Sequence, residues 1–163
     1  AWSVLGLQPR AVLVPAAGAV VADQATKIWA VAALSDGPNE VIWKLRFLLV
    51  HNPGFAFSRG QGLGPLLGIL AVIISVVLWR AKARVDSLPA LLSIGLVVGG
   101  AIGNLADRLF RGEAWLRRSV VDFIDFRFWP VFNLADMAIV VGVVLMFFFF
   151  SRLNQEPNVA SNA

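Results

Sequence analysis

The chain has 163 residues, of which 58% are hydrophobic and 15% are charged, and it contains no cysteine. A soluble domain is closer to half apolar and a quarter charged, so this composition argues against a water-soluble globular protein. The absence of cysteine excludes disulfides, thiol nucleophiles and thiolate metal sites, and the single histidine, His51, supplies a zinc site poorly. The net charge of +4 does not indicate a nucleic-acid binder, because the basic residues flank apolar runs, where they meet membrane lipids.

Four apolar runs predict four transmembrane helices. The first, 11–34, spans about 36 Å at 1.5 Å per residue, which is enough to cross the hydrocarbon core. The others are 63–79, 88–106 and 134–150, and four spans place both chain ends on one side of the membrane. We therefore predict an α-helical integral membrane protein with one membrane-embedded domain, residues 1–153, and a disordered polar tail, residues 154–163.

Two connecting segments predict a small β-structured platform on the membrane surface. Residues 40–50 read as one strand, because Leu45, Phe47 and Leu49 alternate with the residues between them and form an apolar face. The turn-forming sequence His51-Asn52-Pro53-Gly54 follows it. Residues 120–128 also alternate, which indicates a second strand.

The distribution of basic residues leaves the orientation in the membrane open. The compact cluster Arg80, Lys82 and Arg84 favours placing this loop and both termini in the cytoplasm. The full count favours the reverse, since five Lys and Arg residues lie on that side and eight on the other.

The third run carries Gly95, Gly99 and Gly103 at four-residue intervals, which form two overlapping GxxxG steps. Such a smooth strip lets another helix approach closely. We favour packing against a helix of the same chain over homodimerisation, and so expect a monomer.

Polar residues gather at one end of the predicted bundle, because successive helices run in opposite directions. Ionisable residues near the hydrocarbon boundary are costly and tend to mark function. Structural explanations remain open: an Asn133–Asp136 helix cap, an Asp23–Lys27 ion pair, and anchoring of a helix end at the headgroups by Asp107 and Arg108.

Carboxylates are the remaining candidates for chemistry, because no serine lies in a Gly-x-Ser-x-Gly turn beside the lone histidine. Two aspartates a few ångströms apart share a proton, so that one can deprotonate a water while the other binds a carbonyl. Asp122 and Asp136 form the best pair. Spacing alone also allows Asp125, three residues further on, as the partner of Asp136.

Four segments in order resemble the motif series of bacterial lipoprotein signal peptidase (signal peptidase II), and together they cover most of residues 23–142. They are Asp23-Gln24-x-Thr26-Lys27; Asn52-Pro53-Gly54-Phe55-Ala56-Phe57; Gly103-Asn104-Leu105-Ala106-Asp107-Arg108; and Val120-Val121-Asp122-Phe123 with Phe132-Asn133-Leu134-Ala135-Asp136.

The resemblance implies a four-helix aspartyl protease of the bacterial inner membrane, with an extracytoplasmic β-cradle and cytoplasmic termini. It implies removal of signal peptides from diacylglyceryl-modified prolipoproteins, cleaved before the lipidated cysteine, without a metal or organic cofactor. The matching positions give catalytic Asp122 and Asp136, a substrate-binding set, and a supporting set. The substrate-binding set is Asn52, Gly54, Asn104, Arg108 and Asn133, and the supporting set is Asp23, Lys27 and Asp107.

The sequence departs from the family pattern at Phe55, where a small residue is usual, and in the basic stretch 111–119. A transporter or channel is the main alternative function, and a lipid-binding scaffold is another. A transporter predicts charges near the bilayer centre and at both ends, whereas here the second run has none and charge gathers at one boundary.

Overall fold

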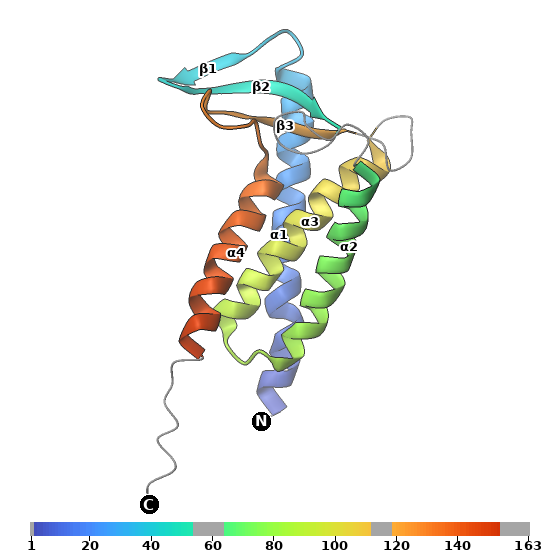
Figure 1. Ribbon diagram of the computed structural model, residues 1–163, viewed down its shortest axis with the longest axis vertical. Coiled ribbons are helices and arrows are strands. Elements are labelled where there is room, and N and C mark those ends of the chain that lie inside the picture. Colours follow the sequence, from blue (N-terminus) through green and yellow to red (C-terminus); the bar gives the residue numbers. More distant parts are fainter. Residues whose placement is uncertain (1, 54–63, 112–118, 154–163) are drawn as a thin grey trace, which may run out of the picture.

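The structure is a computed structural model that describes residues 2–53, 64–111 and 119–153. Within these residues, four long helices form a bundle and three strands form a sheet across one of its ends (Figure 1). The helices are α1 Trp2–Ala33, α2 Gly64–Ala81, α3 Leu88–Phe110 and α4 Leu134–Leu153, with a short 3-10 helix, η2, at Lys82–Arg84. The strands are β1 Asn39–Ile42, β2 Leu45–Asn52 and β3 Val120–Asp125. The beginning of α1 and the end of α4 lie at the end of the bundle away from the sheet.

Among the described residues, three helical segments are long and apolar enough to cross a membrane: Pro9–Ala33, Gly64–Arg84 and Leu88–Phe110. The apolar part of α4, Leu134–Phe150, is shorter. The chain is therefore a mostly helical protein with membrane-capable helices and a small sheet, and the fourth span stays a prediction.

Helix α3 packs closely on α1 through its glycine strip. A Cβ atom on Gly95 would lie 2.5 Å from the Val12 carbonyl oxygen, and one on Gly99 would lie 2.6 Å from that of Ala16. Such distances leave no room for a side chain, so the two backbones touch where only hydrogen occupies the glycine side-chain position. The predicted packing of the strip within the chain is confirmed.

The sheet has the order β1-β2-β3 with both pairs antiparallel. The prediction of a single strand over 40–50 is wrong, because the segment is a hairpin in which Ile42 pairs with Leu45. Trp43 occupies the turn with φ of 50°. Two-residue turns of this kind usually carry Asn or Gly, so Trp43-Lys44 gives no local turn signal in the sequence.

The inner face of the sheet is held on the end of α1 by aromatic packing. Trp29 makes edge-on contacts with Phe47 and Phe123, with ring centroids 5.3 and 6.0 Å apart. Leu45, Phe47 and Leu49 pack against a buried apolar cluster, as the alternation predicted. The cluster consists of Ala30, Leu34, Phe123 and Ile124. This contact fixes β2 and β3 relative to the bundle.

The second predicted strand, 120–128, ends earlier, at Asp125. Beyond it Arg127 has φ of 64°, and the chain bends back until Phe132 pairs with Ile124. This return places the residue before α4, Asn133, within hydrogen-bond distance of Asp122 in β3.

Candidate active site

Asp122 lies in the buried strand β3 and is 3% exposed. Its two carboxylate oxygens accept hydrogen bonds from Asn52 Nδ2 at 2.9 Å and from Asn133 Nδ2 at 2.6 Å. Asn52 reaches it because Val50 stands opposite Asp122 in the sheet, which makes Asn52 the diagonal neighbour. Burial, reinforced by the negative charge of Asp136, raises the pKa of Asp122 to about 6 in spite of these two hydrogen bonds.

Asp136 lies in the first turn of α4 and takes part in capping the N-terminus of that helix. Asn133 Oδ1 accepts the backbone N–H of Asp136 at 2.9 Å, and Asp136 Oδ2 accepts the backbone N–H of Asn133 at 3.2 Å. This reciprocal pair is a capping box, so the structural explanation of these two residues is correct. The cap also fixes the carboxylate, whose Oδ1 accepts a hydrogen bond from Asn104 Nδ2 at 2.7 Å.

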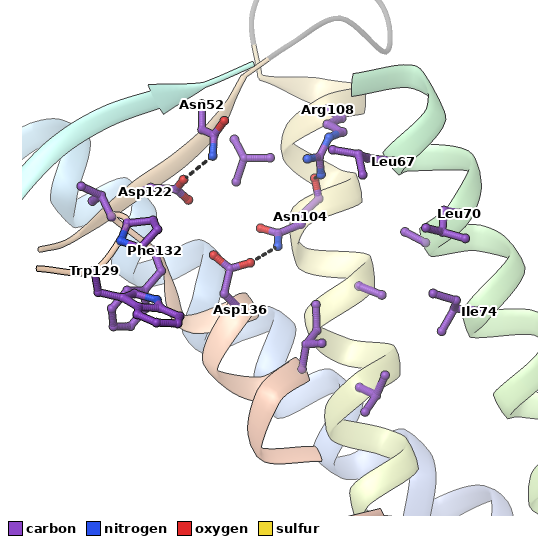
Figure 2. Close-up of a pocket in the computed structure, with 17 residues that line it drawn as sticks. Asn52, Leu67, Leu70, Ile74, Asn104, Arg108, Asp122, Trp129, Phe132 and Asp136 are labelled. Carbon is purple, nitrogen blue, oxygen red and sulfur yellow. Dashed lines mark hydrogen bonds between the residues drawn. The ribbon is translucent and has the colours of Figure 1, made fainter. Parts of the chain in front are cut away.

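Asp122 and Asp136 line the same cavity of about 490 Å³, where they project from β3 and from the start of α4 (Figure 2). Asn52, Asn104 and Arg108 share this polar end of the cavity. The remaining wall is apolar and comes from α2, α3, the start of β3, α4 and the segment before α4: Leu67, Leu70, Ala71, Ile74, Val97, Ala101, Val120, Trp129, Pro130, Val131, Phe132 and Ile139. A second cavity, of about 410 Å³, shares Asn52, Asp122 and residues 129–131 with the first, so the space continues past Asp122.

Arg108 supplies positive charge to this polar end. Its guanidinium Nη1 donates to the backbone carbonyl of Asn104 one turn earlier, at 3.2 Å. The side chain is largely buried, and its charge acts on both Asp122 and Asp136. Arg108 and Asn104 thus face the cavity from one side of α3, as Figure 2 shows.

One described member of the predicted substrate-binding set, Asn133, is not among the residues that line this cavity. Asn133 is fully buried, and its side chain donates to Asp122 and caps α4 by accepting the backbone N–H of Asp136. Gly54 lies outside the described residues, as do Phe55 and residues 112–118 of the basic stretch.

The predicted supporting residues Asp23, Lys27 and Asp107 form a buried ion cluster behind Asn104. Lys27 Nζ lies 2.8 Å from Asp23 Oδ2, which confirms the predicted ion pair, and 2.9 Å from Asp107 Oδ2. Asp107 and Arg108 are 1% and 7% exposed, so the alternative explanation, in which both anchor a helix end at the headgroups, does not hold.

Asp125 is separated from the cavity by the geometry of the strand. Residues three apart on a strand leave opposite faces, so Asp125 points away from the side that carries Asp122. It accepts hydrogen bonds from Arg46 Nε and from the backbone N–H of Arg127, both at 2.6 Å. Burial alone would raise the pKa of Asp125, but these donors hold it below the usual value. Of these two aspartates of β3, Asp122 lines the cavity that Asp136 also lines, and Asp125 is not among its lining residues.

Sequence reasoning missed the apolar cavity wall and the role of Gln24. Leu67, Leu70 and Ile74 belong to a uniformly apolar run, in which nothing distinguishes residues that face a cavity from residues that face lipid. Gln24 belongs to the first of the four motifs, but the sequence assigned it no function. In the structure its amide donates to both Asp23 and Asp107 at 3.1 Å.

The arrangement suits acid–base chemistry on a substrate that is partly apolar. Two carboxylates on one wall can share a proton and activate a water between them. The Asn104 amide and the Arg108 guanidinium are donors that can hold a substrate carbonyl or a developing negative charge. In the part of the chain that the structure describes, no group of three or more His, Cys, Asp or Glu side chains could hold a metal ion.

Comparisons with known proteins point to one family. The family described as Signal peptidase (SPase) II matches residues 16–152. A lipoprotein signal peptidase of Rhodococcus jostii is 42% identical over 144 residues, which cover 85% of this chain and 72% of the relative. One from Mycobacterium leprae is 40% identical over 140 residues, which cover 84% and 69%.

Two solved structures of bacterial membrane enzymes have the same fold. One superposes with a TM-score of 0.77 at 27% identity and covers 92% of this chain and 93% of the other. The second has a TM-score of 0.71 at 28% identity and covers 88% and 92%.

Proposed function

The chain belongs to the signal peptidase II family of aspartic proteases, which remove signal peptides from prolipoproteins, and on that premise we propose its reaction and its active residues. The protein cleaves diacylglyceryl-modified prolipoproteins before the lipidated cysteine, with Asp122 and Asp136 as the catalytic pair. The observation that carries this proposal is the position of both carboxylates at the polar end of one otherwise apolar cavity.

The two aspartates take different parts in hydrolysis. Asp122 holds the shared proton, because burial and the nearby Asp136 raise its pKa to about 6. Asp136 takes a proton from the attacking water while Asp122 protonates the scissile carbonyl oxygen. The water oxygen forms a bond to the carbonyl carbon and gives a tetrahedral diol. When the C–N bond breaks, Asp136 passes its proton to the leaving nitrogen and Asp122 recovers one from a diol hydroxyl.

The cavity wall suits a substrate that carries lipid on one side of the scissile bond. Leu67, Leu70 and Ile74 of α2 face the cavity opposite Asp136, where they can contact acyl chains (Figure 2). At the polar end, Asn52 and Arg108 lie within reach of a peptide backbone. A diacylglyceryl group can then remain in apolar surroundings while the peptide bond meets the carboxylates.

The membrane arrangement follows from the two ends of the bundle. We place four spans across the bacterial inner membrane, with α4 as the fourth, since its 20 residues reach about 30 Å at 1.5 Å per residue. The last turn of α2 and the helix η2 carry Arg80, Lys82 and Arg84, and this basic segment lies at the end away from the sheet and suits the cytoplasmic side. The active site then faces the extracytoplasmic side. The glycine strip of α3 is occupied by α1, which favours a monomer.

The test is cleavage of a diacylglyceryl-modified prolipoprotein by the purified protein, with the cleavage position read by mass spectrometry. We expect release of the signal peptide before the modified cysteine. Asp122→Asn and Asp136→Asn should each lower the rate by about 10²–10⁴-fold, the usual loss when a general acid or base is removed. Asp125→Asn is the matched control on the same strand and should remain active. Variants of the pair within tenfold of the unmodified protein would disprove the assignment.

A further inference from the structure

The buried ion cluster of Asp23, Lys27 and Asp107 does more than pair opposite charges. All three side chains are at most 1% exposed, and they belong to two different helices, α1 and α3. Each carboxylate uses one oxygen for Lys27, at 2.8 Å for Asp23 and 2.9 Å for Asp107. Both carboxylates also accept hydrogen bonds from backbone groups outside these helices.

Each of the two backbone donors belongs to the residue immediately before one of the proposed catalytic aspartates. Asp107 Oδ2 accepts the backbone N–H of Val121 at 3.1 Å, and Val121 immediately precedes Asp122. Asp23 Oδ1 accepts the backbone N–H of Ala135 at 3.0 Å, and Ala135 immediately precedes Asp136. One ammonium group therefore connects the two chain segments that carry the proposed catalytic pair.

Lys27 also determines which way the Asn104 amide faces. Its ammonium donates to Asn104 Oδ1 at 3.1 Å. Because an ammonium group accepts no hydrogen bond, the Asn104 NH2 group cannot take the place of that oxygen. Asn133 Nδ2 donates to the same oxygen at 3.1 Å. The Asn104 Nδ2 group is thereby turned toward Asp136 Oδ1, to which it donates at 2.7 Å.

We propose that Asp23, Lys27 and Asp107 are positioning residues that set the separation and direction of the Asp122 and Asp136 carboxylates. This inference rests on the proposed function of that pair. The Ile124–Phe132 bridge and Asn133 connect β3 directly to the start of α4, and the cluster adds a connection from both of these segments to α1 and α3. In a buried site, hydrogen bonds to charged groups are strong and directional, which suits a part that must hold two reacting groups in place.

The experiment compares Asp107→Ala with Asp107→Asn. Both variants remove the same charge and the hydrogen bonds that Asp107 Oδ1 accepts from Gln24 and Arg111. An asparagine oxygen in the place of Oδ2 can still accept from Lys27 and from the Val121 N–H, whereas alanine cannot. Asp23→Ala tests the arm that leads to Asp136. Ile94→Ala is the control for lost stability, since Ile94 is fully buried in α3 in the apolar cluster at the other end of the bundle.

The kinetic readout is kcat and KM for the prolipoprotein, measured on folded protein. We expect Asp107→Ala and Asp23→Ala to lower kcat by about 10²-fold, the typical cost of displacing reacting groups by about 1 Å, with little change in KM. Asp107→Asn should recover most of that loss. Ile94→Ala should keep the kcat of the unmodified protein even where its thermal stability falls.

The second readout needs no substrate and so separates this inference from the proposed function. The titration of Asp122 is followed by infrared absorption of its carboxyl group, as a difference against Asp122→Asn. The charged groups that act on it are Lys27 from α1, Arg108 from α3 and Asp136 from α4, and Asn52 of β2 and Asn133 donate to it. Since both Asp107 variants remove the same charge, a larger shift in Asp107→Ala than in Asp107→Asn reports displacement of Asp122.

Equal kcat values and equal titration midpoints in Asp107→Ala and Asp107→Asn would overturn the positioning role. If the unmodified protein cleaves no prolipoprotein, the proposed function fails, and the infrared comparison still decides whether the cluster positions Asp122.

Discussion

The interface between α1 and α3 changes character from one end to the other. Away from the sheet, Val12 and Ile94 are fully buried in an apolar cluster, and Gly95 lies against the α1 backbone. At the cavity end the same two helices meet through the ion cluster of Asp23, Lys27 and Asp107. Shape complementarity holds the first end, whereas directional hydrogen bonds hold the second. We therefore expect substitutions at the first end to change stability and substitutions at the second to change activity as well.

Removing the cation of the ion cluster should have the largest effect. Lys27→Met leaves two buried carboxylates without their shared ammonium, and breaking such a pair costs about 3–5 kcal/mol of the free energy of unfolding. We expect cleavage per folded molecule to fall as well. Ile94→Ala, at the apolar end, should cost about 2–5 kcal/mol and preserve activity. Thermal unfolding in detergent and cleavage rates measure both effects, and a stable, active Lys27→Met protein would refute the comparison.

The free energy of unfolding should change with pH because of Asp122, at the cavity end of the molecule. The pKa of Asp122 in the folded protein, about 6, exceeds its ordinary value of 3.8, so the folded state binds this proton more tightly. The resulting stabilisation is complete below pH 3.8 and is lost as the pH rises through about 6. It amounts to at most about 3 kcal/mol, at 1.36 kcal/mol per pKa unit. Unfolding midpoints of the unmodified protein and Asp122→Asn, measured across this range, should therefore diverge.

Asp125 provides the control of opposite sign. Its pKa is lowered in the folded protein, so its contribution to stability is present above pH 3.8 and is lost as the pH falls through the lowered value. The unmodified protein should thus lose stability relative to Asp125→Asn on acidification. The same direction of change for both aspartates would contradict the environments described here.

Two glycines of the strip, Gly103 at the cavity end and Gly95 at the apolar end, allow the two ends to be compared through the addition of a single methyl group. A Cβ on Gly103 would lie 2.7 Å from Asp23 Oδ2, so Gly103→Ala should displace that carboxylate and lower cleavage at least tenfold, which corresponds to about 1.4 kcal/mol. A Cβ on Gly95 would lie 2.5 Å from the Val12 carbonyl oxygen. Gly95→Ala should then force the helices apart, at a cost of about 1–3 kcal/mol of stability, while folded molecules remain active. Equal activity losses per folded molecule would show that the two ends do not differ.

The mildest variant concerns the geometry of one cation at the cavity. Arg108→Lys keeps the charge but removes the planar fork that donates to the Asn104 carbonyl and faces the carboxylates. We expect a rate loss of about 10–100-fold, because a hydrogen bond to a charged group is worth about 1.5–3 kcal/mol, with unchanged thermal stability. Cleavage kinetics and unfolding of the variant measure this, and a wild-type rate would mean that charge alone is sufficient.

Much of the fold could be predicted because long apolar runs and alternating strands are local patterns. The hairpin at Trp43 could not, since its turn conformation is stabilised by the sheet around it and not by turn-forming residues. For the site, the resemblance of the four motifs to signal peptidase II implied Asp122, Asp136 and their polar neighbours.

Sequence spacing could not separate Asp122 from Asp125, because that distinction depends on which face of β3 meets the cavity. It also could not show that Lys27 serves three partners, since Asp107 and Asn104 lie about 80 residues further along the chain.

The capping box at the start of α4 has a consequence for inhibitor resistance. A compound that binds Asp136 could be evaded only by changing that carboxylate or its surroundings. Replacing Asp136 with an apolar residue would also remove the acceptor for the Asn133 backbone N–H, and losing a helix cap costs about 0.5–2 kcal/mol. A substitution of Asp136 that prevents binding of such a compound therefore also destabilises α4. This cost disfavours resistance through a change of this side chain.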